Sequence, residues 1–172
     1  MKTLTDNLTH YAAFHRDTRN IATHFVGVPM IVVAIAILLA RPSFEWLGVA
    51  WSPASLLVLG TLVFYFRMDL TFGLVFVFIY GATWWLAQSL AAQSTTLWLS
   101  WGVGLFVVGW AIQFVGHFWE GKKPAFVDDI AGLFVGPLFV AAEVGFMLGL
   151  RKPLEQAIVA RVGPTRSGPL PT

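Results

Sequence analysis

The sequence predicts an all-α, polytopic membrane protein, and three observations support this fold class. Of the 172 residues, 57% are hydrophobic and only 12% are charged, whereas soluble domains have ~45–50% apolar and ~25% charged residues. The mean hydropathy is +0.73. The apolar residues are gathered in five stretches, each close to the ~20 residues with which a helix crosses a bilayer. This composition excludes a soluble enzyme, and the net charge of +2 is too small to make nucleic acid a partner.

The five apolar stretches are the candidate spans. In chain order they are Ile21–Ala40, Leu47–Phe66, Leu70–Ala91, Leu97–Phe118 and Ile130–Leu150. The second is interrupted near its start by Ser52-Pro53, and the fifth contains Gly136-Pro137 near its middle. Proline removes a hydrogen bond from a helix interior and bends it. The sequence therefore predicts a bundle of four transmembrane spans plus a fifth apolar segment that is broken at Gly136-Pro137 and is tilted or re-entrant.

These segments predict one integral-membrane helical domain over residues 1–155 and a flexible tail over residues 156–172. The last ten residues contain three prolines and two glycines, a composition typical of solvated, irregular chain. The first 24 residues are polar and lack the short apolar run that follows a basic start in a secretory signal. We therefore expect the N-terminus to be retained.

The basic residues predict the orientation of the spans. Three of them precede the first span, and Lys122 and Lys123 follow the fourth. Because Lys and Arg are enriched in cytoplasmic loops, we expect both of these regions, and hence the N-terminus, to face the cytoplasm.

Two polar stripes share one spacing, i, i+4, i+7, which places each stripe on one face of a helix. They are Asn20, His24 and Gly27 in the first span, and Gln113, His117 and Glu120 in the fourth. The topology brings both histidines to the same depth, and polar groups at membrane depth usually face a bundle interior or a functional cavity. Imidazole binds metals, and an amide or carboxylate orients the ring. The stripes favour a metal site, with Glu120 as ligand or orienting group; the alternative is that they form only interhelical hydrogen bonds.

Two further histidines precede the first span. His15 lies nine residues before His24, about 180° around an uninterrupted helix, so both can bind one metal only if the helix breaks between them. Asp17-Thr18 has N-cap chemistry for a helix that begins near Arg19. His10 lies ~21 Å from His24 along an uninterrupted helix and is a weaker candidate.

The segments Tyr11-x3-His15-x4-Asn20-x3-His24-x2-Gly27-x-Pro29 and Gln113-x2-Gly116-His117-x2-Glu120-Gly-Lys-Lys-Pro124-Ala125 resemble the yeast-type 2-hydroxy-fatty-acid dioxygenase family. The resemblance covers nearly the whole chain, and the paired histidine motifs are its specific part. It implies an Fe(II)-dependent enzyme integral to a bacterial inner membrane or, in a eukaryote, the endoplasmic reticulum. The implied reaction is α-oxidation, in which a long-chain 2-hydroxy fatty acid and O2 give the fatty acid one carbon shorter.

The resemblance also implies roles for individual residues. Carried over by motif, the iron ligands are His15, His24 and His117. The catalytic residues around them are Asn20, Gln113 and Glu120. His10 lies outside the motif and inherits no role. The chain has Thr18 and Arg19 where family members often have proline and lysine, so it departs from the family at the turn that follows His15.

The expected partners follow from this chemistry. Fe(2+) is the expected cofactor, and a 2-hydroxy acid could chelate it through its hydroxyl and carboxylate and supply the electrons itself. No organic cofactor is then needed. Lys122 and Lys123 are candidate substrate-binding residues that would neutralise the carboxylate. Membrane lipid is a further partner, and the sequence leaves open whether the chain forms a homo-oligomer.

Two alternatives belong to other functional classes. A proton-coupled small transporter would use Glu143, Asp69 and His117 as a relay, but the sequence has no inverted repeat and little intramembrane charge. A non-catalytic membrane scaffold would use the polar stripes only to join helices. Bound metal separates the enzyme from both alternatives.

Overall fold

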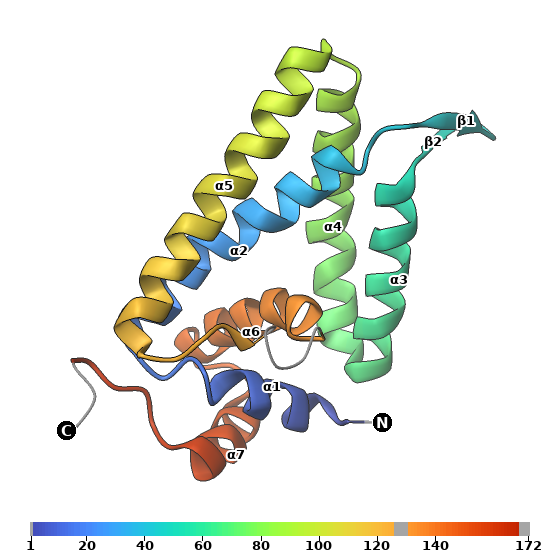
Figure 1. The fold of residues 1–172 in the computed structure, drawn as a ribbon. Coiled ribbons are helices and arrows are strands. Elements are labelled where there is room, and N and C mark those ends of the chain that lie inside the picture. The colour runs from blue at the N-terminus through green and yellow to red at the C-terminus, as the bar shows by residue number, and fades with distance from the viewer. Residues whose placement is uncertain (1, 126–130, 169–172) are drawn as a thin grey trace. The chain divides into compact units, whose positions relative to one another are not determined.

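The computed structural model describes residues 2–125 and 131–168, and most of these residues are helical (Figure 1). The elements in chain order are α1 (Leu4–Ala12), α2 (Thr18–Leu38), β1 (Phe44–Trp46), β2 (Val49–Trp51), α3 (Pro53–Met68), α4 (Leu70–Ala91), α5 (Thr95–Glu120), α6 (Gly132–Met147) and α7 (Lys152–Val162). The predicted helical class is confirmed.

Within residues 2–125 and 131–168, three helices are long and apolar enough to cross a membrane: α2, α4 and α5. The pair α6 and α7, bent by 113°, counts as a fourth candidate if it is taken as one span. Helix α3 is apolar but has only 16 residues. The structure thus supports three to four candidate spans, and the predicted count of four spans plus a fifth re-entrant segment is not confirmed.

The chain divides into two compact units, residues 1–28 with 110–172 and residues 29–109. In the second unit, α3 packs against α4. The fully buried Tyr65 lies between them, with its hydroxyl 3.1 Å from that of Tyr80. Asp69 joins the two helices and caps α4, because its carboxylate accepts a hydrogen bond of 3.1 Å from the backbone N–H of Phe72.

The predicted second span starts later than Leu47, because residues 44–51 form a hairpin. Strands β1 and β2 pair antiparallel with Phe44 opposite Trp51. The two residues between the strands, Leu47 and Gly48, have φ of 54° and 72°, the left-handed backbone that two-residue hairpin turns require. Helix α3 begins only at Pro53, which occupies the first helical turn where its missing N–H costs nothing.

The remaining core of the second unit consists of small and aliphatic side chains from the end of α2 and the end of α4. Its buried members are Ala36, Ile37, Ala40, Ala87 and Ala91, with Trp98 and Leu105 of α5 packed against them. Small residues let helix backbones approach closely, as is common between membrane helices.

The first unit contains the predicted polar stripes. It consists of α1, the start of α2, the end of α5, and α6 with α7, and α1 packs against both α6 and α7. The chain is not helical between α1 and α2, over residues 13–17. A helix break in this region is the condition that the sequence set for His15 and His24 to bind one metal. The carboxylate of Asp17 accepts a hydrogen bond of 2.9 Å from the backbone N–H of Arg19, so it caps α2.

The fifth apolar segment is bent, but not at Gly136-Pro137 as predicted. Helix α6 continues through Pro137, which lies in its second turn and removes a single intrahelical hydrogen bond. The bend follows α6, where Gly149 and Arg151 have φ of 74° and 57°. Gly136 serves close packing instead, because a Cβ there would lie 3.0 Å from the hydroxyl oxygen of Tyr11.

The C-terminal region is ordered over part of the predicted tail. Helix α7 extends to Val162, and Arg166 forms a bridge with Asp17. Residues 169–172 lie outside the described residues. The division into a membrane domain of residues 1–155 and a tail of residues 156–172 stays a prediction.

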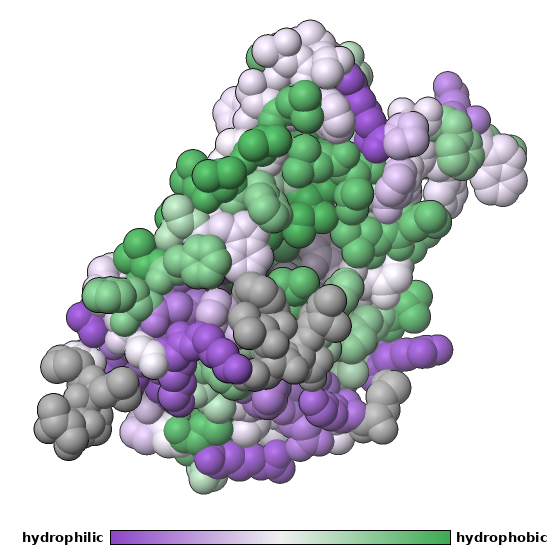
Figure 2. Space-filling model, in the orientation of Figure 1, coloured by the Kyte–Doolittle hydropathy of each residue, from purple (hydrophilic) through white to green (hydrophobic). Residues whose placement is uncertain are grey.

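Large hydrophobic side chains are exposed on the helices, and Figure 2 shows many of them on one face. Phe78 of α4 is 79% exposed and Phe118 of α5 is 83% exposed. Extensive exposed apolar surface marks contact with a partner or a membrane. It agrees with helices whose length and composition suit a bilayer.

We expect Gly116→Val to destabilise the protein by about 1–3 kcal/mol, the usual cost of overpacking. A Cβ at Gly116 would collide with the hydroxyl of Thr23 and lie 2.5 Å from Oδ1 of Asn20. Thermal unfolding of the detergent-solubilised protein measures the effect. Gly104→Val on the same helix is the control, because nothing lies within 4 Å of a Cβ there. Equal melting temperatures for the two variants would contradict this packing.

Candidate metal centre

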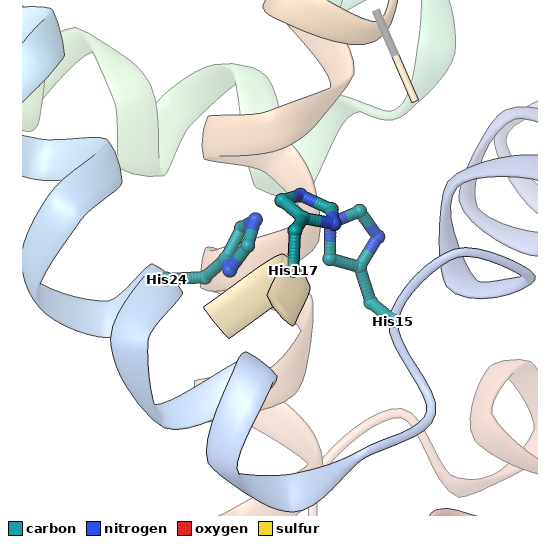
Figure 3. Close-up of side chains that lie close together, drawn as sticks. All are labelled: His15, His24 and His117. Atoms are coloured by element: carbon teal, nitrogen blue, oxygen red, sulfur yellow. The ribbon is translucent and has the colours of Figure 1, made fainter. Parts of the chain in front are cut away.

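Three imidazole rings, two from the N-terminal region and one from the end of α5, converge in the first unit (Figure 3). His15 comes from the break between α1 and α2, His24 from α2, and His117 from the last turn of α5. One ring nitrogen of each lies within 4.8 Å of those of the other two, and all three side chains are buried. Such a group could hold a metal ion.

The ring of His15 is held by Tyr11, one helical turn earlier. Its Nδ1 lies 2.7 Å from the backbone carbonyl oxygen of Tyr11, and because a carbonyl only accepts, Nδ1 carries the hydrogen. The phenol ring of Tyr11 stacks on the imidazole with centroids 4.2 Å apart and planes 3° from parallel. The other nitrogen, Nε2, is buried and has no hydrogen-bond partner within the described residues. A lone pair is therefore left available at Nε2.

His24 and His117 are arranged in a related way. Nδ1 of His24 donates to the backbone carbonyl oxygen of Asn20 at 2.8 Å, which leaves Nε2 as its acceptor nitrogen. Nδ1 of His117 is buried and makes no hydrogen bond to any described residue. The ring centroids are 4.3 Å apart for His15 and His24, and 5.2 Å apart for His24 and His117.

The environment favours uncharged imidazole at this position. Burial, and next the adjacent ring of His24, hold the pKa of His15 well below its ordinary value of 6.5. Neutral imidazole with one nitrogen hydrogen-bonded and the other free is the form that ligates metals. Imidazole suits Fe(II) as well as Zn and Cu. The donor set thus fits a divalent transition metal, including the iron that the family resemblance implies.

Glu120 lies beside the three histidines as a fully buried carboxylate. Its Oε2 accepts from the backbone N–H of Arg16 at 3.0 Å and of Asp17 at 2.7 Å. The same oxygen accepts from Nδ2 of Asn20 at 3.2 Å, while Oε1 accepts from Nη2 of Arg166 at 3.0 Å. Both oxygens are engaged with the chain, so in this structure Glu120 orients the His15 loop.

Two buried amide oxygens lie one helical turn before the histidines of α2 and α5. Asn20 donates through Nδ2 to the carbonyl oxygen of Phe14 at 3.2 Å and to Glu120, which leaves Oδ1 without a partner in the described chain. Oε1 of Gln113 is likewise buried without a partner among those residues. Both can accept a hydrogen bond from a bound molecule.

The remaining candidates have exposed side chains. Nζ of Lys122 donates to the carbonyl oxygen of Ala13 at 2.7 Å, next to the His15 loop, and Lys123 is exposed. His10 is also exposed and does not belong to the histidine group.

Sequence reasoning gave no role to two residues that support the site, Tyr11, which appears in the motif, and Arg166. The spacing of four residues between Tyr11 and His15 is a signal for a contact on one helix face, although the helix ends between them. Arg166 gives no such signal, because it lies 46 residues after its partner Glu120.

Comparisons with known proteins agree with these features. A family model described as 2-hydroxy-palmitic acid dioxygenase Mpo1-like matches residues 1–148, a range that includes all three histidines. A curated relative, the 2-hydroxy-palmitic acid dioxygenase MPO1 of Saccharomyces cerevisiae, is 29% identical over 160 residues, which cover 90% of this chain and 87% of the relative. No solved structure matches the chain significantly.

We expect the single substitutions His15→Ala, His24→Ala and His117→Ala each to weaken metal binding. The loss should exceed the roughly 10–100-fold loss of affinity seen when a residue that only hydrogen-bonds to a metal ligand is removed. Iron retained per chain, measured by elemental analysis after anaerobic Fe(II) loading and desalting, tests this. His10→Ala is the matched control and should retain the wild-type amount. Loss of iron in His10→Ala, or full retention in His24→Ala, would contradict the three-histidine site.

Proposed function

This chain belongs to the 2-hydroxy-palmitic acid dioxygenase Mpo1-like family, and we propose that it is an iron-dependent membrane dioxygenase of fatty acid α-oxidation. Its substrate would be a long-chain 2-hydroxy fatty acid, the class that the name of the yeast relative indicates. The observation that carries the proposal is the convergence of three buried histidines within 4.8 Å of one another. The family membership supports this reaction among those that such a site allows.

The overall reaction balances without a further reductant. A 2-hydroxy acid R–CH(OH)–COOH and O2 give R–COOH, CO2 and H2O. The hydroxyl-bearing carbon and the departing carboxyl carbon together lose four electrons, which equals the number that fully reduces O2. When bound, Fe(II) would supply the redox chemistry that lets O2 react. His15, His24 and His117 would hold it and leave coordination positions open.

The unpartnered amide oxygens give the site a means of orienting its substrate. We propose that Oδ1 of Asn20 and Oε1 of Gln113, both buried and without partners in the described chain, accept hydrogen bonds from the substrate hydroxyl or from water in the site. A buried acceptor without a donor costs about 1–3 kcal/mol. A bound molecule that donates to these oxygens is therefore favoured over one that cannot.

The polar and apolar ends of the substrate find different surroundings. Lys122 and Lys123 would attract the carboxylate; Lys122 already lies against the His15 loop. Phe114 and Phe118 lie on the same helix as His117 and are 53% and 83% exposed. They offer an apolar surface to the acyl chain and the surrounding lipid. With basic residues at this end of the spans, we place the N-terminus in the cytoplasm.

A product assay on the purified, Fe(II)-loaded protein in detergent tests the function. With 2-hydroxy-palmitic acid in air, we expect the 15-carbon fatty acid by mass spectrometry. His24→Ala should lower the yield by roughly 100-fold or more, because it removes a metal ligand, and His10→Ala should not. Bound iron without shortened acid across several chain lengths would contradict the reaction. Absence of both iron and product would favour a scaffold or transporter.

We expect the double variant Lys122→Ala/Lys123→Ala to raise KM for the hydroxy acid by about five- to thirtyfold with little change in kcat. Partly exposed charge contacts contribute up to ~1 kcal/mol each, and uniform loss of binding appears in KM. Steady-state kinetics at equal iron content measure this. Lys152→Ala, which changes an exposed lysine of α7, is the control. An unchanged KM would leave the two lysines as membrane anchors only.

A further inference from the structure

The segment that follows α7 runs along the loop that carries His15. We call residues 163–168 the C-terminal strap. Arg166 forms a parallel bridge with Asp17, in which the N–H of Arg166 donates to the carbonyl oxygen of Arg16 at 2.8 Å and the N–H of Thr18 donates to the carbonyl oxygen of Arg166 at 2.9 Å. Nη1 of Arg16 in turn donates to the carbonyl oxygen of Gly163 at 3.1 Å. The strap is therefore joined to the His15 loop by backbone hydrogen bonds donated in both directions.

The side chain of Arg166 connects the strap to the end of α5. Its Nη2 donates to Oε1 of Glu120 at 3.0 Å and to the backbone carbonyl oxygen of Glu120 at 3.2 Å. Glu120 is fully buried, whereas the Arg166 side chain is 23% exposed. A buried carboxylate is very unfavourable unless it is paired and hydrogen-bonded. Arg166 is the cation that pairs with Glu120 within the described chain.

The other oxygen of Glu120 holds the loop itself. Oε2 accepts from the backbone N–H groups of Arg16 and Asp17, which immediately follow His15. One carboxylate thus joins three segments: the strap through Oε1, the His15 loop through Oε2, and α5, where Glu120 lies three residues after His117. The carboxylate therefore connects the strap to the backbone that immediately follows His15.

We propose that the C-terminal strap, acting through Arg166, positions His15 in the three-histidine site. Arg166 is a positioning residue: it reaches the site through Glu120 and the loop. The family model ends at residue 148, so this element lies beyond the matched region. The inference rests on the proposed function only in that the site binds a metal, and part of its test needs neither metal nor turnover.

The first test measures metal affinity in the full-length protein in detergent. Co(II) serves as a spectroscopic probe in place of Fe(II), and its absorption bands report the geometry of the ligands. We expect Arg166→Ala to weaken Co(II) binding by roughly 10–100-fold, as loss of an outer partner does, and to alter the bands. Arg166→Lys, which restores the positive charge beside Glu120, should recover most of the affinity. Arg161→Ala is the matched control, because Arg161 pairs with Asp6 at the surface.

The second test needs no metal. Amide hydrogen exchange of the metal-free protein, read by mass spectrometry on a peptide spanning residues 13–20, should be at least about tenfold faster in Arg166→Ala, because opening the strap exposes these amides. Peptides from α4 should be unchanged. If Arg166→Ala does not yield folded protein, Arg166→Gln, which keeps a donor without the charge, undergoes the same two measurements.

The outcomes separate this inference from the proposed function. Wild-type protein that binds neither Fe(II) nor Co(II) would contradict the proposed function, while faster exchange at residues 13–20 would still support the strap. Unchanged exchange at those residues together with Co(II) affinity within twofold of wild type would overturn the strap. Equal loss of affinity in Arg161→Ala would also overturn it, because the effect would then be general loosening of the C-terminal region.

Discussion

The buried carboxylate of Glu120 is the interaction on which the site depends. It accepts two backbone N–H groups from residues 16 and 17, one amide from Asn20 and one guanidinium hydrogen bond from Arg166. Those backbone groups lie in a break between helices, where no ladder partner exists. A charged acceptor is well suited to several donors at once, because hydrogen bonds to ionised groups are stronger than neutral ones. The negative charge of Glu120, which accepts the hydrogen bonds of the loop, is itself stabilised by its ion pair with Arg166.

This arrangement explains how histidines nine residues apart can share a site. On one uninterrupted helix, His15 and His24 would face opposite sides. The chain instead ends α1 at Ala12 and begins α2 at Thr18, and Glu120 holds the turn between them. Tyr11, stacked on the ring of His15, fixes its orientation from the preceding helix. Local backbone chemistry at the break and one long-range carboxylate together place the third imidazole.

Much of the site could be predicted from the sequence, because helical spacing is a local property. The two stripes with spacing i, i+4, i+7 identified His24 and His117 as neighbours, and Asp17-Thr18 indicated the helix start that frees His15. Arg166 could not be found, because its contact with Glu120 spans 46 residues and has no periodic signature. The hairpin at residues 44–51 was likewise missed: its apolar strands resemble the start of a span. The bend after α6 depends on left-handed backbone at Gly149 and Arg151. The sequence analysis instead predicted the break at Gly136-Pro137, because proline commonly bends a helix.

The charge balance of the site bears on which molecules it can bind. Many Fe(II) oxygenases use two histidines and one carboxylate, so that one ligand charge offsets part of the metal's. Here the group that could hold a metal consists of three histidines, and the nearby carboxylate, Glu120, is already paired with Arg166. A divalent ion bound by neutral imidazoles in buried surroundings retains its full charge, and Coulomb interactions are strong where the effective dielectric constant is low.

An anionic ligand that chelates the ion is therefore favoured over a neutral one. A 2-hydroxy acid supplies the missing negative charge and a second oxygen in the same molecule, whereas the corresponding alcohol or ester does not. With the proposed metal bound, this donor set would therefore favour a free acid as the ligand.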